Sequence, residues 1–115
     1  MKQVLITLIA ATFVLVSAPK ASASDVSVRV CEYVQANDKK RLRSYLKDQK
    51  IKVKVIFESV GCDGDNILVF AAKSQSLEVG EFLIGKTPKK HVKASLDAIK
   101  AASAHLGEAA NKRVN

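Results

Sequence analysis

The stretch GDNILVFAAKSQSLEVGEFLI, which runs from Gly64 to Ile84, decides the fold. Its two apolar runs are separated by the polar loop Ser74–Ser76. Asp65 or Asn66 can cap the first run as a helix and Ser76 can cap the second, because short polar side chains accept hydrogen bonds from the free N–H groups of a first turn. The stretch therefore predicts a helix-turn-helix unit, which can bury its apolar face only against a neighbour.

A weaker copy of this unit lies 37 residues upstream. Its turn, Asn37-Asp38, aligns with Ser74-Gln75, and Asp38 is a suitable N-cap for the helix that follows. The aligned apolar pairs are Val30 with Ile67, Cys31 with Leu68, Tyr33 with Phe70, Val34 with Ala71, Leu42 with Val79, Tyr45 with Phe82 and Leu46 with Leu83. The sequence thus predicts two helix-turn-helix units of one design. A short strand over residues 26–30 is the alternative for the start of the first unit.

A longer helix is predicted after the second unit. Thr87-Pro88 favours a helix start, with Thr87 as the N-cap and Pro88 as the first helical residue, and Gly107 is a typical end. One apolar stripe follows the predicted helix: Val92, Leu96, Ile99 and Leu106. The tail after Gly107 is expected to fray. Residues 50–60 are interpreted as an extended link with a short helical turn at Val55–Ser59, since IKVKV has no partner strand. The expected fold is all-α, with about five helices: two helix-turn-helix units and a C-terminal helix.

The N-terminus predicts export. Lys2 precedes an apolar run from Val4 to Val16, and Ala21-Ser22-Ala23 is a typical cleavage site. We expect a signal peptide at residues 1–23 and one mature domain at residues 24–115, periplasmic or secreted. The alternative is a membrane anchor, but the apolar run rises only about 20 Å as a helix, short of a bilayer core of about 30 Å.

The two cysteines, Cys31 and Cys62, are expected to form a structural disulfide, since an even count in an exported chain is typical of one. A redox or metal site is the alternative. No C-x-x-C pattern supports it, and His91 and His105 have no ligand-like spacing. Asp63 begins no complete calcium loop, because Leu68 and Ser74 occupy the positions that need Gly and Glu. We expect no catalytic residue, no metal and no cofactor.

Basic residues are concentrated between Lys39 and Lys54. This segment has eight basic residues and one acidic residue, Asp48, so it carries a net charge of +7. Helical spacing predicts a basic strip, and the residues expected to bind anions are Lys39, Lys40, Arg43, Lys47, Lys50, Lys52 and Lys54. The alternative is a solvated face that only keeps the protein soluble. Aromatic residues are few and Trp is absent, so nucleic acid is not an expected partner.

The second unit resembles an ankyrin repeat. Asp63-Gly64, Leu68, Ala71-Ala72, Glu78-Val79 and Phe82-Leu83-Ile84 match the ankyrin pattern, whereas Asn66-Ile67, Val69 and Gln75 depart from it. The whole mature chain also resembles a family of small exported bacterial proteins known only as a domain of unknown function, through Cys31-Glu32-Tyr33 and Cys62-Asp63-Gly64. Because the sequence holds no catalytic motif, we expect a non-enzymatic exported binding protein, and the ankyrin resemblance implies a protein partner. The alternative is a binder of anionic surfaces, either lipid headgroups or a polyanionic polysaccharide. The oligomeric state stays open.

Overall fold

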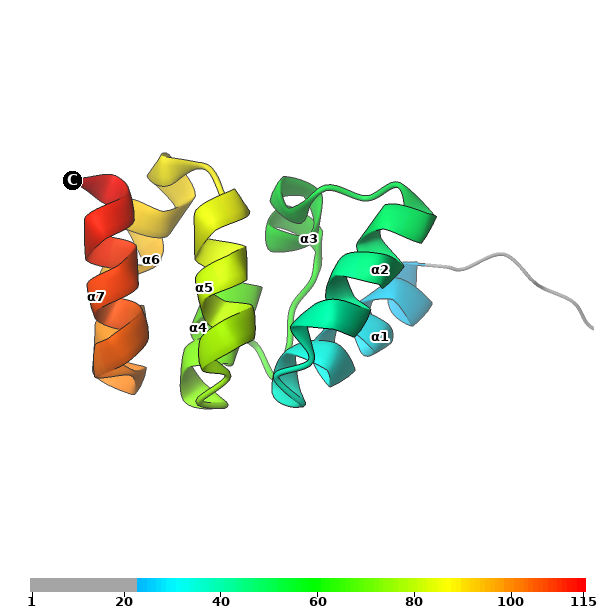
Figure 1. Cartoon of the computed structure of the whole chain (residues 1–115), viewed down its shortest axis with the longest axis horizontal. Coiled ribbons are helices and arrows are strands. Elements are labelled where there is room, and N and C mark those ends of the chain that lie inside the picture. The colour runs from blue at the N-terminus through cyan, green and yellow to red at the C-terminus, as the bar shows by residue number, and fades with distance from the viewer. Residues whose placement is uncertain (1–22) are drawn as a thin grey trace, which may run out of the picture.

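The structure, a computed structural model, describes residues 23–115, which form helices joined by short loops (Figure 1). The helices are α1 (Ala23–Gln35), α2 (Lys39–Gln49), α3 (Val53–Ser59), α4 (Ile67–Lys73), α5 (Leu77–Lys86), α6 (Lys89–Ala102) and α7 (Ala104–Val114). The predicted all-α class is confirmed, with seven helices over these residues in place of about five. The predicted signal peptide lies outside the described residues except for Ala23, where α1 begins.

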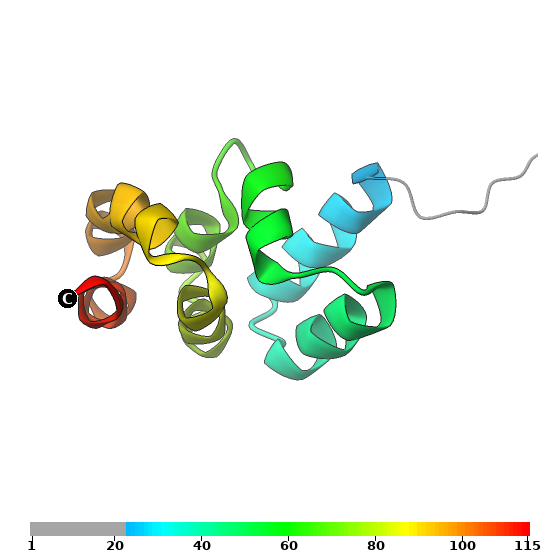
Figure 2. The same cartoon turned by 90° about the horizontal axis from the view of Figure 1, so that it is seen from above.

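The helices form three hairpins, α1–α2, α4–α5 and α6–α7, stacked in chain order (Figures 1 and 2). In one layer α4 contacts both α1 and α6, and in the other α5 contacts both α2 and α7. The short helix α3 packs against α4 and α5. Each hairpin contributes fully buried side chains to one continuous core, among them Leu42, Leu83 and Leu106.

The predicted C-terminal helix is in fact a third hairpin. Ser103 interrupts it with extended backbone (φ −151°, ψ 115°), and its hydroxyl accepts a hydrogen bond from the Leu106 N–H at 3.1 Å as the N-cap of α7. The prediction that the tail after Gly107 frays is therefore wrong, because α7 buries Leu106 and Ala110 against the core. Gly107 does not end a helix. It lies inside α7, where it lets α6 approach closely.

Gly107→Ala is expected to destabilise the protein by about 1–3 kcal/mol. A Cβ at this position would lie 2.8 Å from the Lys100 Cα, so the backbones of α6 and α7 must separate. Gly85→Ala in α5 is the matched control. Its Cβ meets nothing within 4 Å, and we expect it to stabilise by about 0.5–1 kcal/mol, because Gly is costly inside a helix. Urea unfolding measures the change in the free energy of unfolding in both variants. A change of the same sign in both would contradict the packing described.

The first two hairpins turn in the same way. In each turn a residue with left-handed backbone, Asn37 (φ 55°) or Gln75 (φ 57°), follows the first helix. The hydrogen bonds from the Asp38 N–H to the Tyr33 carbonyl and from the Ser76 N–H to the Ala71 carbonyl are equivalent, as in a Schellman motif. The turns are thus related by 38 residues and not by the 37 of the sequence alignment. The alignment of apolar residues does not detect the extra residue, because Ile67 to Ala72 of α4 are all buried and a shift of one position still pairs apolar residues.

Some of the helix caps are those that the sequence predicts, and others are not. Asp38 caps α2 by accepting from the Arg41 N–H at 3.1 Å, and Asn66 caps α4, as expected. Ser76 stands before α5, but its hydroxyl donates to the Val34 carbonyl of the first hairpin. The Val79 N–H donates instead to the Asn37 side chain at 3.0 Å. The first hairpin therefore caps a helix of the second.

The Thr87 hydroxyl also differs from its predicted role. It donates to the Leu83 carbonyl at 2.7 Å and so closes the end of α5, while Pro88 takes the N-cap position of α6. The hydroxyl therefore completes the preceding helix, and α6 has no side-chain cap.

The predicted disulfide joins Cys31 of α1 to Cys62 in the loop before α4, with Cα atoms 5.8 Å apart. The Cys62 and Asp65 backbones exchange two hydrogen bonds across a tight turn. Asp63 (φ 54°) and Gly64 (φ 82°) at the tip have the positive φ values that a type I′ turn requires. The disulfide therefore ties α1, the first helix of the first hairpin, to the loop that leads into the second hairpin.

Candidate anion-binding groove

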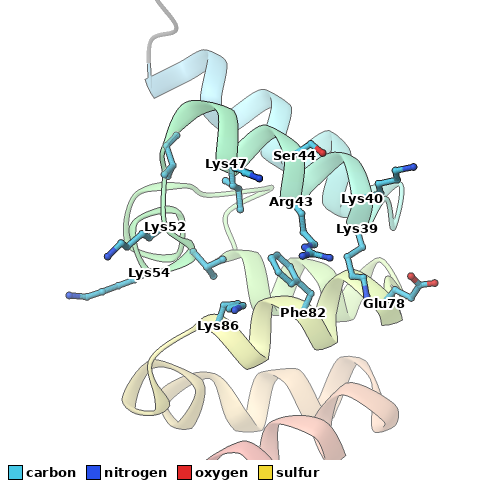
Figure 3. A pocket seen from close by; sticks show the side chains of 13 residues that line it. Lys39, Lys40, Arg43, Ser44, Lys47, Lys52, Lys54, Glu78, Phe82 and Lys86 are labelled. Atoms are coloured by element: carbon cyan, nitrogen blue, oxygen red, sulfur yellow. The ribbon is translucent and has the colours of Figure 1, made fainter.

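A groove of about 710 Å³ runs between α2 and α5 and is bordered at one end by the start of α3 (Figure 3). Seven basic side chains and one acidic side chain line it. The basic residues are Lys39, Lys40, Arg43, Lys47, Lys52, Lys54 and Lys86; the acidic residue is Glu78.

The position at which α2 begins and its helical period determine which side chains form the α2 wall of the groove. Asp38 fixes the start of α2, so Lys39, Arg43 and Lys47 stand four residues apart on one face. Leu42 and Leu46 occupy the inward face and are buried. The basic side chains are therefore held along the groove by the same helix that contributes to the core.

Six of the seven predicted anion-binding residues line the groove, and Lys50 does not. Lys50 is the left-handed residue (φ 57°) that ends α2, and its side chain is exposed. The predicted helical turn at Val55–Ser59 is a helix that begins two residues earlier, because α3 starts at Val53, so the extended link before it is shorter than expected. This helix buries Val53 and leaves Val55 48% exposed. Lys52 and Lys54 still reach the groove from the start of α3.

The opposite wall comes from α5, and sequence reasoning did not include it. Lys86 adds a cation and Phe82 an aromatic ring, which Figure 3 shows pointing from α5 toward α2. Phe82 lies in the predicted second unit, but Lys86 lies two residues beyond its predicted end at Ile84. The one sequence signal that links them is their spacing of four residues, which puts both on one face if the helix continues to Lys86. They join the basic strip because the first two hairpins stack.

The floor of the groove is apolar. Leu46 and Val53 are buried, and Ile51 and Phe82 are partly buried against the same core. The Arg43 guanidinium carbon lies 5.9 Å from the centroid of the Phe82 ring. This distance suits a cation–π contact, which contributes about 0.5–1 kcal/mol at an exposed site. The groove thus combines positive charge at its rim with apolar surface below.

None of the basic side chains of the groove forms an ion pair within residues 23–115, although the acidic Glu78 also lines the groove. Within residues 23–115, the ion pairs join Arg41 to Asp38, Lys73 to Asp65, His91 to Glu58 and His105 to Glu81, so none involves a groove residue. Like charges four residues apart on a helix destabilise it by a few tenths of a kcal/mol each. A concave surface lined by one sign of charge concentrates its field and attracts ions of the opposite sign.

The histidines lie away from the groove and hold helices together. His91 of α6 lies 3.3 Å from a Glu58 carboxylate oxygen and stacks on the ring of Phe57 in α3. His105 of α7 contacts Glu81 of α5. Among residues 23–115, no three His, Cys, Asp or Glu side chains are grouped to hold a metal ion. Of the described helices, none is both long and apolar enough to cross a bilayer.

Stacked helical hairpins with a basic groove define a small helical domain with one candidate ligand surface. Residues 30–94 match the model of a family described as "Protein of unknown function (DUF3718)", and the chain belongs to this family. The match includes the disulfide and every residue that lines the groove. No curated protein and no solved structure matches the chain.

Proposed function

We propose that this protein is an exported, non-enzymatic binding protein and that the groove between α2 and α5 is its ligand surface. The observation that carries the proposal is the gathering of seven basic side chains, none of them in an ion pair and with Glu78 as the one acidic side chain of the lining, around an apolar floor. Seven like charges oppose one another, so an anionic ligand would relieve this repulsion on binding.

Two features support export. The N-terminal sequence has the pattern of a signal peptide. The Cys31–Cys62 disulfide fits an oxidising compartment, because structural disulfides persist there and are rare where thiols are kept reduced. The proposed location is periplasmic or secreted.

A protein partner is the first candidate. The α4–α5 hairpin carries the residues that resemble an ankyrin repeat, and it packs between the hairpins α1–α2 and α6–α7. Ankyrin-like hairpins that stack in this way present a surface to other proteins, an argument by analogy of fold. An acidic segment of the partner would complement the groove.

An anionic surface is the second candidate, either lipid headgroups or a polyanionic polysaccharide. The exposed side chain of Lys50 extends the positive charge beyond the groove, and Lys40 also borders a neighbouring depression on α2. A broad basic face of this kind suits a ligand larger than the groove itself.

Adsorption at low salt tests the proposal. The oxidised domain of residues 24–115 is expected to be retained by heparin or by an acidic peptide matrix at 0.01 M salt. It should be released toward 0.15 M, as the Debye length falls from about 30 Å to about 8 Å. Absence of retention at 0.01 M on both matrices, or retention indifferent to salt, would contradict an electrostatic ligand surface.

A further inference from the structure

We propose that the groove recognises an acidic peptide segment of about five residues with one aromatic or large aliphatic side chain at its centre. This inference rests on the proposed function and specifies the ligand. It follows from the arrangement of charge and apolar surface within the groove, and not from net charge alone.

The groove provides two separate kinds of contact. Lys39, Arg43 and Lys47 on α2 and Lys86 on α5 place positive charge on both walls. Phe82 lies between them in Figure 3, partly buried and directed toward α2. A ligand that makes both kinds of contact must carry carboxylates along its length and an apolar side chain that reaches the Phe82 ring.

The size of the groove limits the ligand. The α2 residues that line it run from Lys39 to Lys47, a stretch that rises about 13 Å at 1.5 Å per residue, and Lys52 and Lys54 continue the lining at the start of α3. An extended chain advances about 3.3 Å per residue, so about four residues span the α2 wall and a fifth reaches α3. The volume of about 710 Å³ lies within the range of about 300–1,000 Å³ that is typical of ligand sites.

The floor favours a peptide over the other anionic ligands. A flat bilayer surface would rest on the rim of the groove and leave the Phe82 ring uncovered. A polyanionic polysaccharide has charge but no apolar side chain to place on the floor. A peptide has both, and burial of one large apolar side chain is worth about tenfold or more in affinity.

The groove is also asymmetric along its length. Figure 3 places Glu78 beside Lys39 at one end and Lys52, Lys54 and Lys86 toward the other. The end near α3 is therefore purely cationic, while Glu78 offsets part of the charge at the start of α2. Carboxylates of the peptide that lie toward α3 should contribute most to binding.

A double-mutant cycle tests the central side chain. The probes are two blocked pentapeptides, each with four Glu residues, one with Phe and one with Ala at the centre. We expect the oxidised domain of residues 24–115 to bind the Phe peptide about tenfold more tightly than the Ala peptide or better. In Phe82→Ala this ratio should fall to about one, because the ring that contacts the central side chain is missing.

Phe57→Ala is the matched control, since Phe57 is also partly buried but stacks on His91 and does not line the groove. The Phe57→Ala variant should keep the same ratio of affinities for the Phe and Ala peptides as the unmodified domain. Circular dichroism checks the fold of each variant. If Phe82→Ala does not fold, Phe82→Leu replaces it, with an expected ratio between one and that of the unmodified domain.

Three outcomes would overturn the inference: equal affinity of both peptides for the unmodified domain, an unchanged ratio in the Phe82 variant, or binding to anionic vesicles or heparin without binding to either peptide. In each of these cases the groove can still be an anion-binding surface. If the domain binds neither peptide, vesicles nor heparin at low salt, the proposed function fails together with the inference.

Discussion

Replacing both cysteines, as Cys31→Ser with Cys62→Ser, is expected to lower the free energy of unfolding by roughly 3–4 kcal/mol. The disulfide closes a loop with a sequence separation of 31, and its loss frees that loop in the unfolded chain. A domain of this size has about 5–15 kcal/mol of stability in total, so the loss is a large fraction. We expect a drop of roughly 15–25 °C in Tm.

The effect of losing the disulfide should be largest in the first hairpin. Besides the disulfide, α1 is held by its buried residues Val30 and Val34 and by the hydrogen bond from Ser76 to the Val34 carbonyl. The hairpins α4–α5 and α6–α7 have their own buried contacts. Helix content should therefore persist below the melt, while amides of α1 exchange faster with solvent.

Urea unfolding and hydrogen exchange of the oxidised and double-serine proteins measure this effect. Alkylation of the native protein without reductant should label neither cysteine. Two freely labelled thiols, or a stability change below about 1 kcal/mol, would show that the fold does not depend on this disulfide.

Features set by neighbouring residues could be predicted from the sequence. Asp38 and Asn66 cap the helices that they precede because a cap needs only its own first turn. The disulfide pairing followed from there being two cysteines. The basic residues of α2 lie on one face because helical period alone places them there.

Features that depend on contacts between hairpins could not be predicted. Asn37 caps α5 from another hairpin, and no local pattern reveals such a pair. Phe82 and Lys86 enter the groove because α5 packs beside α2. The break at Ser103 was hidden for a different reason: Val92, Ile99 and Leu106 keep an unbroken seven-residue spacing, since α6 and α7 both bury their apolar faces in one core.

The largest functional effect is expected from reversing the charge of the groove with Lys39→Glu, Lys40→Glu and Lys47→Glu. An exposed charge pair contributes about 0.2–1 kcal/mol, and reversal replaces attraction by repulsion. Three reversals should therefore weaken the binding of an acidic probe by roughly 100-fold. The fold should persist, because Lys39 and Lys40 lie in the first turn of α2, where acidic side chains favour the helix dipole.

The control variant, Lys89→Glu with Lys90→Glu and Lys93→Glu, changes the net charge by the same amount. All three side chains are exposed on α6, which packs on α4 and α7 and does not line the groove. At 0.1 M salt the Debye length is about 10 Å, so charges farther than this from a ligand in the groove are largely screened from it.

The affinity of the two triple variants for the same acidic probe at 0.1 M salt is the most direct test of the groove as the ligand surface. The groove variant should lose about 100-fold in affinity, while the α6 variant should stay within about threefold of the unmodified domain. Equal loss in the two variants would show that net charge alone attracts the probe, and the groove would then not be the binding site.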